Sequence, residues 1–428
     1  MKISKSQSTP IILTGILCLA FSAIVVNGAL QGALHQPFES LETTSNETIF
    51  SRGTFVGPAL SLLHTGTFNY GGREKGYVGL IQRGPAFASV LALSLLLFGE
   101  NVFAVLFING LSFALAIIFL WLISKRFLPG IWQFVPSLML ALFWEISALF
   151  WVGNYEMFTL AIVTFSFFTL LQYKEINHLG WLAAAAASFA VLVTERPMTL
   201  YFVPFLVCFI ILWRWPRHEK KRVFTHALFF LFIVGAVVSP WAYRNYRVLD
   251  TWQLGSPGHV ILRRSSHVNF SSEELISMML SFSVGDLIGS KLSAHYPPDG
   301  KPKTWDPNVE ARWYQPDWMI ADLDGETLTR IELDKKMVKE ARANIQRRPI
   351  KFFLTGFINF FRLNAPMNYN GMEMMHFFAG DNKAISETTK IAINLGIRIT
   401  WLLFVIAALL GAATQLTAWT GLSVIAFF

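Results

Sequence analysis

The stretch RGPAFASVLALSLLLFG, residues 83–99, decides which side of a membrane each later loop of this chain lies on. Its apolar run, 85–98, is shorter than the roughly 20 residues that a helix needs to cross a bilayer. If this run does not cross and the N-terminus is cytoplasmic, the basic residues of the later short loops lie in the cytoplasm. If the run does cross, the same basic residues lie outside. These residues are Lys125, Arg126, Lys174 and the cluster at 214–222. The positive-inside rule favours the first arrangement, so we expect 85–98 to form a re-entrant or interfacial helix within an external loop.

The composition of the whole chain requires a membrane. Of the 428 residues, 54% are hydrophobic and 14% are charged, and the mean hydropathy is +0.47. So few polar residues cannot cover the apolar surface of the chain in water, and the bilayer must act as a second solvent. The net charge of +8 comes without a nucleic-acid-binding signature, so we expect membrane lipids but no nucleic acid as partners.

Hydrophobic runs predict an all-α polytopic membrane protein with roughly ten transmembrane helices and interfacial helices in the first external loop. The first run follows Lys2 and Lys5 and is long enough to span, so we interpret it as an uncleaved helix rather than a signal peptide. Cys18 and Cys208 lie inside such runs and are expected to be buried thiols. The expected spans are 11–30, 101–124, 131–150, 155–173, 179–194, 197–213, 223–242, 350–363, 391–412 and 414–428.

Three regions follow from these spans. Residues 1–242 form an N-terminal transmembrane module with a first external loop at about 31–100. Residues 243–349 form a second external region, and 350–428 carry the C-terminal transmembrane helices.

Local patterns predict three features outside the spans. Residues 54–63 form a short amphipathic helix that ends at Gly66, and 326–348 form a charged amphipathic helix. Glu156 stands at the start of a helix, where a carboxylate complements the macrodipole.

The external loops carry charged residues that suit chemistry at a membrane surface. Glu39, Glu42, Glu47 and Glu74 are the acids of the first loop, and a carboxylate there can deprotonate a hydroxyl acceptor for attack on a sugar carbon. The alternative is that they are ordinary solvated loop charges.

Arginines stand just outside the hydrophobic runs, at Arg83, Arg196 and Arg244. Their guanidinium forks suit a lipid phosphate. Interfacial snorkelling is the alternative for each alone, but their clustering on one expected membrane face favours phosphate binding.

The histidines of the second external region carry no metal signal. His259, His267 and His295 lack the spacing of metal ligands, so no metal site is expected.

A set of short motifs in a fixed order resembles the C-type membrane glycosyltransferases, a group that includes protein O-mannosyltransferases and the bacterial transferases that attach aminoarabinose to lipid A. The motifs are Phe55, Ala59, Leu62-Leu63, Gly66-Thr67-Phe68, Arg83-Gly84-Pro85-Ala86-Phe87, Phe98-Gly99, Asn154-Tyr155-Glu156, Thr194-Glu195-Arg196-Pro197, Pro240-Trp241-Ala242-Tyr243-Arg244-Asn245-Tyr246 and Arg348-Pro349. The resemblance implies a polyprenyl-phosphate sugar as donor and a first-loop acid as base or donor-site contact.

One position departs from the family. The place of the family's first-loop aspartate is taken by Ser51, which cannot act as a base. Glu47 lies one turn upstream and would face the same way on a helix. We therefore take Glu47 as the candidate catalytic residue and Glu74 as a second one, and a non-catalytic relative of the fold is the alternative.

The leading hypothesis is a membrane glycosyltransferase that moves a sugar from a polyprenyl-phosphate donor to a lipid, glycan or protein acceptor. It would act on the non-cytoplasmic face of the cytoplasmic (inner) membrane, with the donor phosphate held by Arg83, Arg196 and Arg244. A polysaccharide polymerase or ligase, which would use Arg264 and His267, is the alternative enzyme. A transporter is disfavoured because ionisable residues at helix centres are not evident. The sugar, the acceptor, any cofactor and the oligomeric state stay open.

Overall fold

The computed structural model describes residues 5–30, 56–68, 84–143, 150–151, 155–214, 220–255, 258–273, 275–276, 279 and 330–364, and the single positions 392, 395–396, 398–399, 402 and 406. Every element within these ranges is a helix. The chain divides into two units, Met1–Pro257 (unit 1) and Gly258–Phe428 (unit 2), and each is described by itself.

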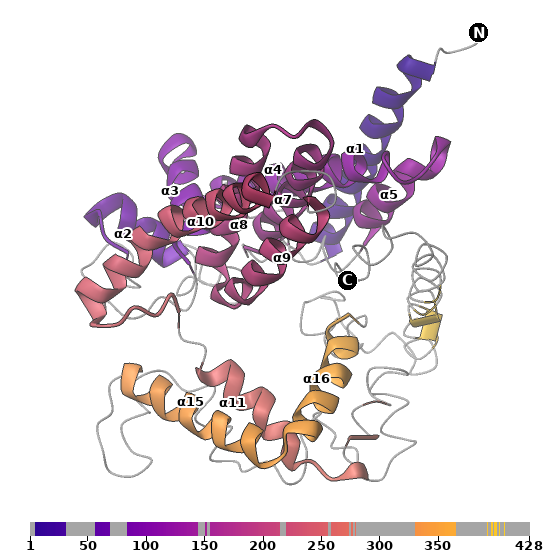
Figure 1. Ribbon diagram of the computed structural model, residues 1–428. Helices are drawn as coiled ribbons and strands as arrows, with labels where there is room; N and C mark the ends of the chain where they lie inside the picture. Colours follow the sequence, from indigo (N-terminus) through magenta and orange to yellow (C-terminus); the bar gives the residue numbers. More distant parts are fainter. Residues whose placement is uncertain are drawn as a thin grey trace. The chain divides into compact units, whose positions relative to one another are not determined.

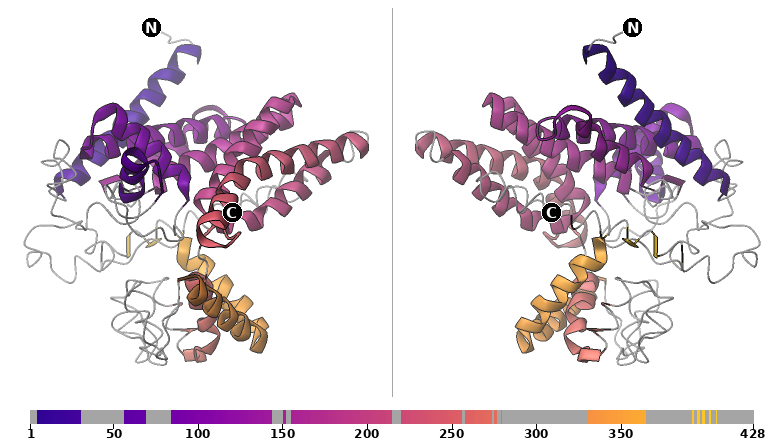
Figure 2. Two further views of the ribbon diagram at one scale, coloured as in Figure 1. Left: turned by 90° about the vertical axis from the view of Figure 1, so that its left-hand side faces the viewer. Right: turned by 90° about the vertical axis from the view of Figure 1, so that its right-hand side faces the viewer.

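Unit 1 is a bundle of apolar helices (Figure 1). Figure 2 shows α1 and α10 on opposite sides of this unit. The helices are α1 (Lys5–Leu30), α2 (Gly57–Thr65), α3 (Pro85–Phe98), α4 (Val102–Ser124), η3 (Gly130–Phe134), α5 (Val135–Leu142), α7 (Glu156–Ile176), α8 (Leu179–Glu195), η4 (Pro197–Phe202), α9 (Val203–Arg214) and α10 (Lys220–Leu249).

Among the described residues, four helices are long and apolar enough to cross a membrane: Thr9–Val26, Val102–Ser124, Glu156–Ile176 and Lys221–Leu249. The shorter apolar helices are Pro85–Phe98, Gly130–Leu142, Leu179–Glu195, Pro197–Ile211 and Pro349–Ile358. The all-helical membrane architecture is thus confirmed. The number of ten spans stays a prediction, because most of 391–412 and all of 414–428 lie outside the described residues.

The directions of the helices follow from contacts between them. α4 and α7 run parallel, because Phe119 of α4 packs on Phe165 of α7 with ring centroids 5.0 Å apart, and further along Arg126 pairs with Glu175 at 3.5 Å. α8 runs antiparallel to α7. The start of α4, the start of α7 and the end of α8 therefore lie at the same end of the bundle.

α3 has both of its ends at this end of the bundle. Its start meets the last residue of α8, where the amide of Gly84 donates to the carbonyl of Glu195 at 3.4 Å. Near its other end the hydroxyl of Ser94 donates to the carbonyl of Ala104, in the first turn of α4, at 2.7 Å. α3 therefore does not run the length of the bundle. We call this end of unit 1 the α3 end.

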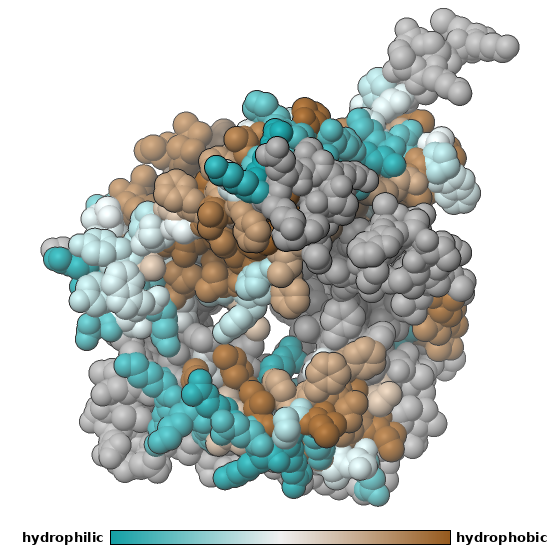
Figure 3. All heavy atoms as spheres, viewed as in Figure 1, coloured by the Kyte–Doolittle hydropathy of each residue, from teal (hydrophilic) through white to brown (hydrophobic). Residues whose placement is uncertain are grey.

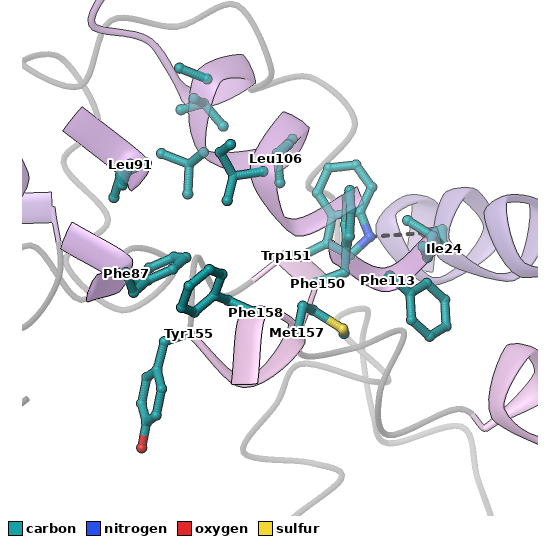
Figure 4. Packing of buried hydrophobic residues seen from close by; sticks show 14 of the residues in the cluster. Ile24, Phe87, Leu91, Leu106, Phe113, Phe150, Trp151, Tyr155, Met157 and Phe158 are labelled. Atoms are coloured by element: carbon teal, nitrogen blue, oxygen red, sulfur yellow. Dashed lines mark hydrogen bonds between the residues drawn. The ribbon is translucent and has the colours of Figure 1, made fainter. Parts of the chain in front are cut away.

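The core of unit 1 joins α1 to α3, α4, α5 and α7 through buried hydrophobic side chains (Figure 4). Phe87, Leu91 and Phe113 are fully buried. The indole of Trp151, five residues before the start of α7, donates to the carbonyl of Ile24 on α1 at 2.9 Å. Lipid is as apolar as these side chains, so close packing and hydrogen bonds, rather than the hydrophobic effect, hold such helices together.

Small residues bring α7 and α8 into close contact. α8 carries the run AAAAAS, residues 183–188, and small side chains let helix backbones approach. The hydroxyl of Ser166 on α7 donates to Ser188 on α8 at 2.9 Å within this contact. The second core cluster continues from here into α9 and α10.

Large hydrophobic side chains are also exposed on the helices of unit 1, among them Leu97, Phe205 and Phe232. Figure 3 shows such hydrophobic side chains gathered over the helices of this unit. Cys18 and Cys208 share this outer surface and are exposed, so the prediction of buried thiols was wrong. In a membrane bundle an apolar run presents apolar side chains to lipid as well as to its neighbours, so an apolar run does not by itself indicate burial in protein.

Unit 2 contains α11 (Gly258–Ser266), η5 (His267–Asn269), α15 (Arg330–Arg347) and α16 (Pro349–Asn364). Leu262 of α11 packs against Met337 and Ala341 of α15. The charged helix predicted at 326–348 is confirmed by α15, and the apolar run at 350–363 is helical, within α16. The region boundaries at 242/243 and 349/350 stay predictions.

Candidate functional site at the α3 end

The start of α3 is held by a buried carboxylate from α8. Glu195 is 2% exposed, and its Oε2 accepts a hydrogen bond from the amide of Phe87, in the first turn of α3, at 2.9 Å. The first amides of a helix have no partner within it and carry the positive end of its dipole. A carboxylate at this position satisfies an amide and opposes that partial charge. Glu195 therefore fixes where α3 begins.

Gly84 lets the chain pass close to α8 at this point. A Cβ atom added to Gly84 would overlap the carbonyl oxygen of Thr194 and lie 2.5 Å from the Cα of Glu195. Real side chains cannot approach backbone so closely. Glycine is required here by the close contact between two backbones, since the φ of Gly84, −74°, is open to any residue.

The next residue of the same turn, Arg196, reaches the start of α7. Its guanidinium forms an ion pair with the carboxylate of Glu156 and lies 4.7 Å from the ring centroid of Tyr155. Figure 4 shows the hydroxyl of Tyr155 pointing away from Phe87 and Phe158. The Nε of Arg196 is buried and has no hydrogen-bond acceptor among the described residues.

Arg244, near the end of α10, reaches the chain just after α2. It donates to the carbonyl of Phe68 at 2.8 Å and to the side-chain oxygen of Asn245 at 3.0 Å. Its guanidinium also lies 5.0 Å from the ring centroid of Trp241. The rings of Phe68 and Trp241 meet edge to face at 5.5 Å. Two contacts therefore join the end of α10 to the first loop.

The segment after α10 folds back and links these parts. The indole of Trp241 donates to the carbonyl of Leu254 at 3.1 Å, and the side-chain amide of Asn245 donates to the backbone carbonyl of Gln253 at 2.8 Å. Gly255 packs against Pro197, so closely that an added Cβ would lie 2.9 Å from the ring. The turn at the end of α8 and the end of α10 are thus parts of one assembly.

α2 completes the assembly. It is the amphipathic helix predicted at 54–63, and Gly66 ends it with a left-handed φ of 67°, as predicted. His64 Nε2 lies 2.6 Å from Oε1 of Glu100, in the turn between α3 and α4. α2 is therefore joined to the start of α4 through His64 and to α10 through Phe68.

The sequence-predicted residues divide into two groups. Arg196 and Arg244 lie at the α3 end, and each is paired with a named oxygen and an aromatic ring. Glu47, Glu74 and Arg83 lie outside the described residues, so their candidate roles stay predictions. Within the described residues, no cluster of His, Cys, Asp or Glu could hold a metal ion.

Glu195 and the pair His64–Glu100 were not chosen from the sequence. A signal for Glu195 was present, because it is a carboxylate directly at the end of an apolar run, and charged residues at membrane depth indicate function or a specific partner. The partner of His64 is 36 positions away and had no sequence signal.

Residues 82–243 match the sequence model of the family described as dolichyl-phosphate-mannose-protein mannosyltransferase. The predicted resemblance to membrane glycosyltransferases is confirmed. Comparison with curated proteins and with solved structures gave no match.

The mannosyltransferase match covers much of the α3 end. It includes α3, the Glu195–Arg196 turn, Glu156 and Trp241, and it stops one residue before Arg244. Glu47, His64 and Glu74 precede its first residue. The match therefore supports a membrane glycosyltransferase family for the helices within residues 82–243. It does not test the candidate bases Glu47 and Glu74, which precede it.

Proposed function

We propose that this protein transfers a sugar, with mannose as the first candidate, from a polyprenyl-phosphate donor to an acceptor on the non-cytoplasmic face of the cytoplasmic membrane. The observation that carries the proposal is the mannosyltransferase match over residues 82–243, whose described part includes the charged turn at the α3 end.

The arginines of the α3 end suit a phosphate monoester or diester. A guanidinium presents donors in a rigid fork, and an aromatic ring beneath it fixes the plane of that fork. Arg196 is held over Tyr155 and Arg244 over Trp241. An anion bound at the turn would also supply the acceptor that Nε of Arg196 lacks among the described residues.

The candidates Arg83, Glu47 and Glu74 keep the roles that the sequence predicts for them. Arg83 directly precedes Gly84 in the sequence, and Gly84 is held against Glu195. In the proposed reaction Arg83, Arg196 and Arg244 bind the donor phosphate, and Glu47 or Glu74 accepts the proton of the acceptor hydroxyl.

The alternative of a polymerase or ligase receives less support. It would use Arg264 and His267, and His267 is a buried residue whose ring packs 4.8 Å from that of Phe270. A buried imidazole packed on phenylalanine suits a structural role better than contact with a polysaccharide.

The test is transfer from a defined donor. The full chain is reconstituted in liposomes with radiolabelled mannosyl polyprenyl phosphate and an extract of membrane lipids, glycans and proteins, and label is followed from donor to each fraction. We expect label to leave the donor in wild-type protein. No consumption of the mannosyl donor, or of the corresponding glucosyl and aminoarabinosyl donors, would overturn the proposal.

A matched pair of arginine variants tests the phosphate site. Arg244→Gln removes the guanidinium over Trp241, whereas Arg247→Gln removes an exposed one less than a turn further along α10. We expect the KM for the donor to rise about tenfold or more in the first variant, because charge-assisted contacts to phosphate contribute about 1.5–3 kcal/mol. The second variant should stay within twofold of wild type, and equal effects would refute a specific role for Arg244.

The candidate acids are tested together. The double variant Glu47→Gln, Glu74→Gln removes both carboxylates at little change in volume. Unchanged transfer by this variant would remove both residues as candidates.

A further inference from the structure

We infer that His64 and Glu100 form a catalytic dyad in which His64 is a general base for the acceptor hydroxyl and Glu100 positions it. The inference rests on the proposed function and places the base at His64, in the described part of the first loop, instead of at Glu47 or Glu74. It stands on the geometry of the pair, on its exposure and on its place at the α3 end.

The pair fixes the tautomer of the imidazole. Nε2 of His64 lies 2.6 Å from Oε1 of Glu100. An ionised carboxylate only accepts hydrogen bonds, so Nε2 must carry the proton. The other ring nitrogen, Nδ1, then has its lone pair available in the neutral imidazole. A carboxylate that orients an imidazole in this way also stabilises the imidazolium formed when Nδ1 takes a proton.

The pair is accessible to an acceptor. The side chain of His64 is 36% exposed and that of Glu100 is 21% exposed. A residue with only a packing role in this bundle would be expected to lie among the buried faces of α2, which are formed by Gly57, Pro58, Ala59 and Ser61. His64 lies instead on the open side of the helix.

The two helices beside the pair, α2 and α3, bring no second ionisable side chain to it. His64 is the one ionisable residue of α2, and α3, which packs against it, carries no Asp, Glu, Lys, Arg or His. From α10, Arg244 binds the carbonyl of Phe68, four residues after His64. The segment 64–68 therefore carries His64 at one end and the carbonyl bound by Arg244 at the other. Arg244, which would hold the donor phosphate, contacts the same short segment as the base that would take the acceptor proton.

The proposed step is a single displacement. The oxygen of the acceptor hydroxyl forms a bond to the anomeric carbon of the sugar while the bond from that carbon to the phosphate oxygen breaks. The electron pair of the broken bond stays on polyprenyl phosphate, and the hydroxyl proton moves to Nδ1 of His64. The imidazolium then releases this proton to solvent, which restores the dyad.

The first arm of the test is chemical rescue. His64→Ala is expected to lower kcat by about 100-fold or more, the usual size of a general-base contribution, with the KM for mannosyl polyprenyl phosphate within twofold of wild type. Added imidazole should restore part of the rate, because the site of His64 is open to solvent. Loss of activity with no rescue, together with lower thermal stability, would overturn the catalytic role in favour of a structural tether.

The second arm separates kcat from KM. Glu100→Gln keeps the size of the side chain but removes the negative charge that orients the imidazole, so we expect kcat to fall about tenfold or more while the KM for mannosyl polyprenyl phosphate stays within twofold of wild type. Glu175→Gln, an acid paired with Arg126 at the other end of α7, is the control and should leave both constants at their wild-type values. A Glu100→Gln protein with the kcat of wild type would refute the dyad.

The outcomes separate the two proposals. A wild-type protein that transfers sugar while the His64 and Glu100 variants behave as wild type would overturn the dyad and leave the proposed function intact. A wild-type protein that consumes none of the lipid-linked donors would overturn both.

Discussion

The two ends of the helix bundle in unit 1 both carry charged residues, but the contacts that hold them differ in kind. At the α3 end, Arg244 binds a carbonyl 176 positions away and Phe87 binds a carboxylate 108 positions away. At the opposite end, Arg126 pairs with Glu175, and Tyr173 is bonded to His226, 53 positions away.

The two ends differ in how many segments of the chain meet there. At the opposite end the contacts join helices in pairs, with Tyr173 of α7 bonded to His226 of α10 and Arg126, after α4, paired with Glu175 of α7. The α3 end gathers α2, α3, α7, α8 and α10 around one charged turn. A site assembled from many segments can present several groups to one ligand, so we expect substitutions at the α3 end to change activity and those at the opposite end to change stability alone.

The largest effect is expected at Gly84. Gly84→Ala would place a methyl group into the backbone of Thr194 and Glu195, so the two segments must separate. We expect a loss of about 3 kcal/mol or more in stability, above the usual range for overpacking because backbone cannot rotate away. Thermal unfolding of the detergent-solubilised protein measures it. Gly235→Ala, on α10 with open space around it, is the control and should unfold at or above the wild-type temperature.

The next effect is expected at Glu195. Glu195→Ala removes the buried acceptor of the Phe87 amide, which should cost about 1.5–3 kcal/mol, the value of a hydrogen bond to a charged group. Since the start of α3 would no longer be fixed, transfer activity should fall as well. Full activity in a stably folded Glu195→Ala protein would show that the position of α3 does not matter for the site.

A smaller effect is expected from Tyr173→Phe at the opposite end. The change removes one buried hydrogen bond to His226 at nearly constant volume and should lower stability by about 1 kcal/mol. The kcat should remain at the wild-type value. A clear drop in kcat without a change in unfolding temperature would contradict the distinction between the two ends.

The smallest effect is expected for the ion pair of Arg196 and Glu156. Their side chains are 38% and 35% exposed, so solvent screens the pair and we expect a coupling of only about 0.5 kcal/mol in a double-mutant cycle of stability. In activity assays Arg196→Gln should raise the KM for the donor more than Glu156→Gln does. Equal changes in KM would indicate that the arginine serves Glu156 rather than the donor phosphate.

Features that depend on nearby residues were predictable from the sequence. The helix at 85–98, the end of α2 at Gly66 and the start of α7 at Glu156 all appear where the sequence placed them, because Pro, Gly and a first-turn carboxylate act within one turn of their own position.

Features that depend on distant residues were not predictable in the same way. No local pattern pairs Glu195 with the amide of Phe87 or His64 with Glu100, since only the packed bundle brings these segments together. The exposure of Cys18 was missed for a related reason, because hydropathy indicates that a helix is apolar without indicating whether it faces protein or lipid. The candidate acids Glu47 and Glu74 stay predictions.

The attachment of α3 at both ends also limits how this part of the chain can evolve. Its first turn is bonded to Glu195, and Ser94 in its last turns is bonded to Ala104. One inserted residue would lengthen the helix by about 1.5 Å and turn everything after it by about 100°. The hydroxyl at position 94 would then leave its acceptor while the start of the helix stayed in place. Within this segment, point substitutions on the exposed face should be tolerated far better than any single-residue insertion or deletion.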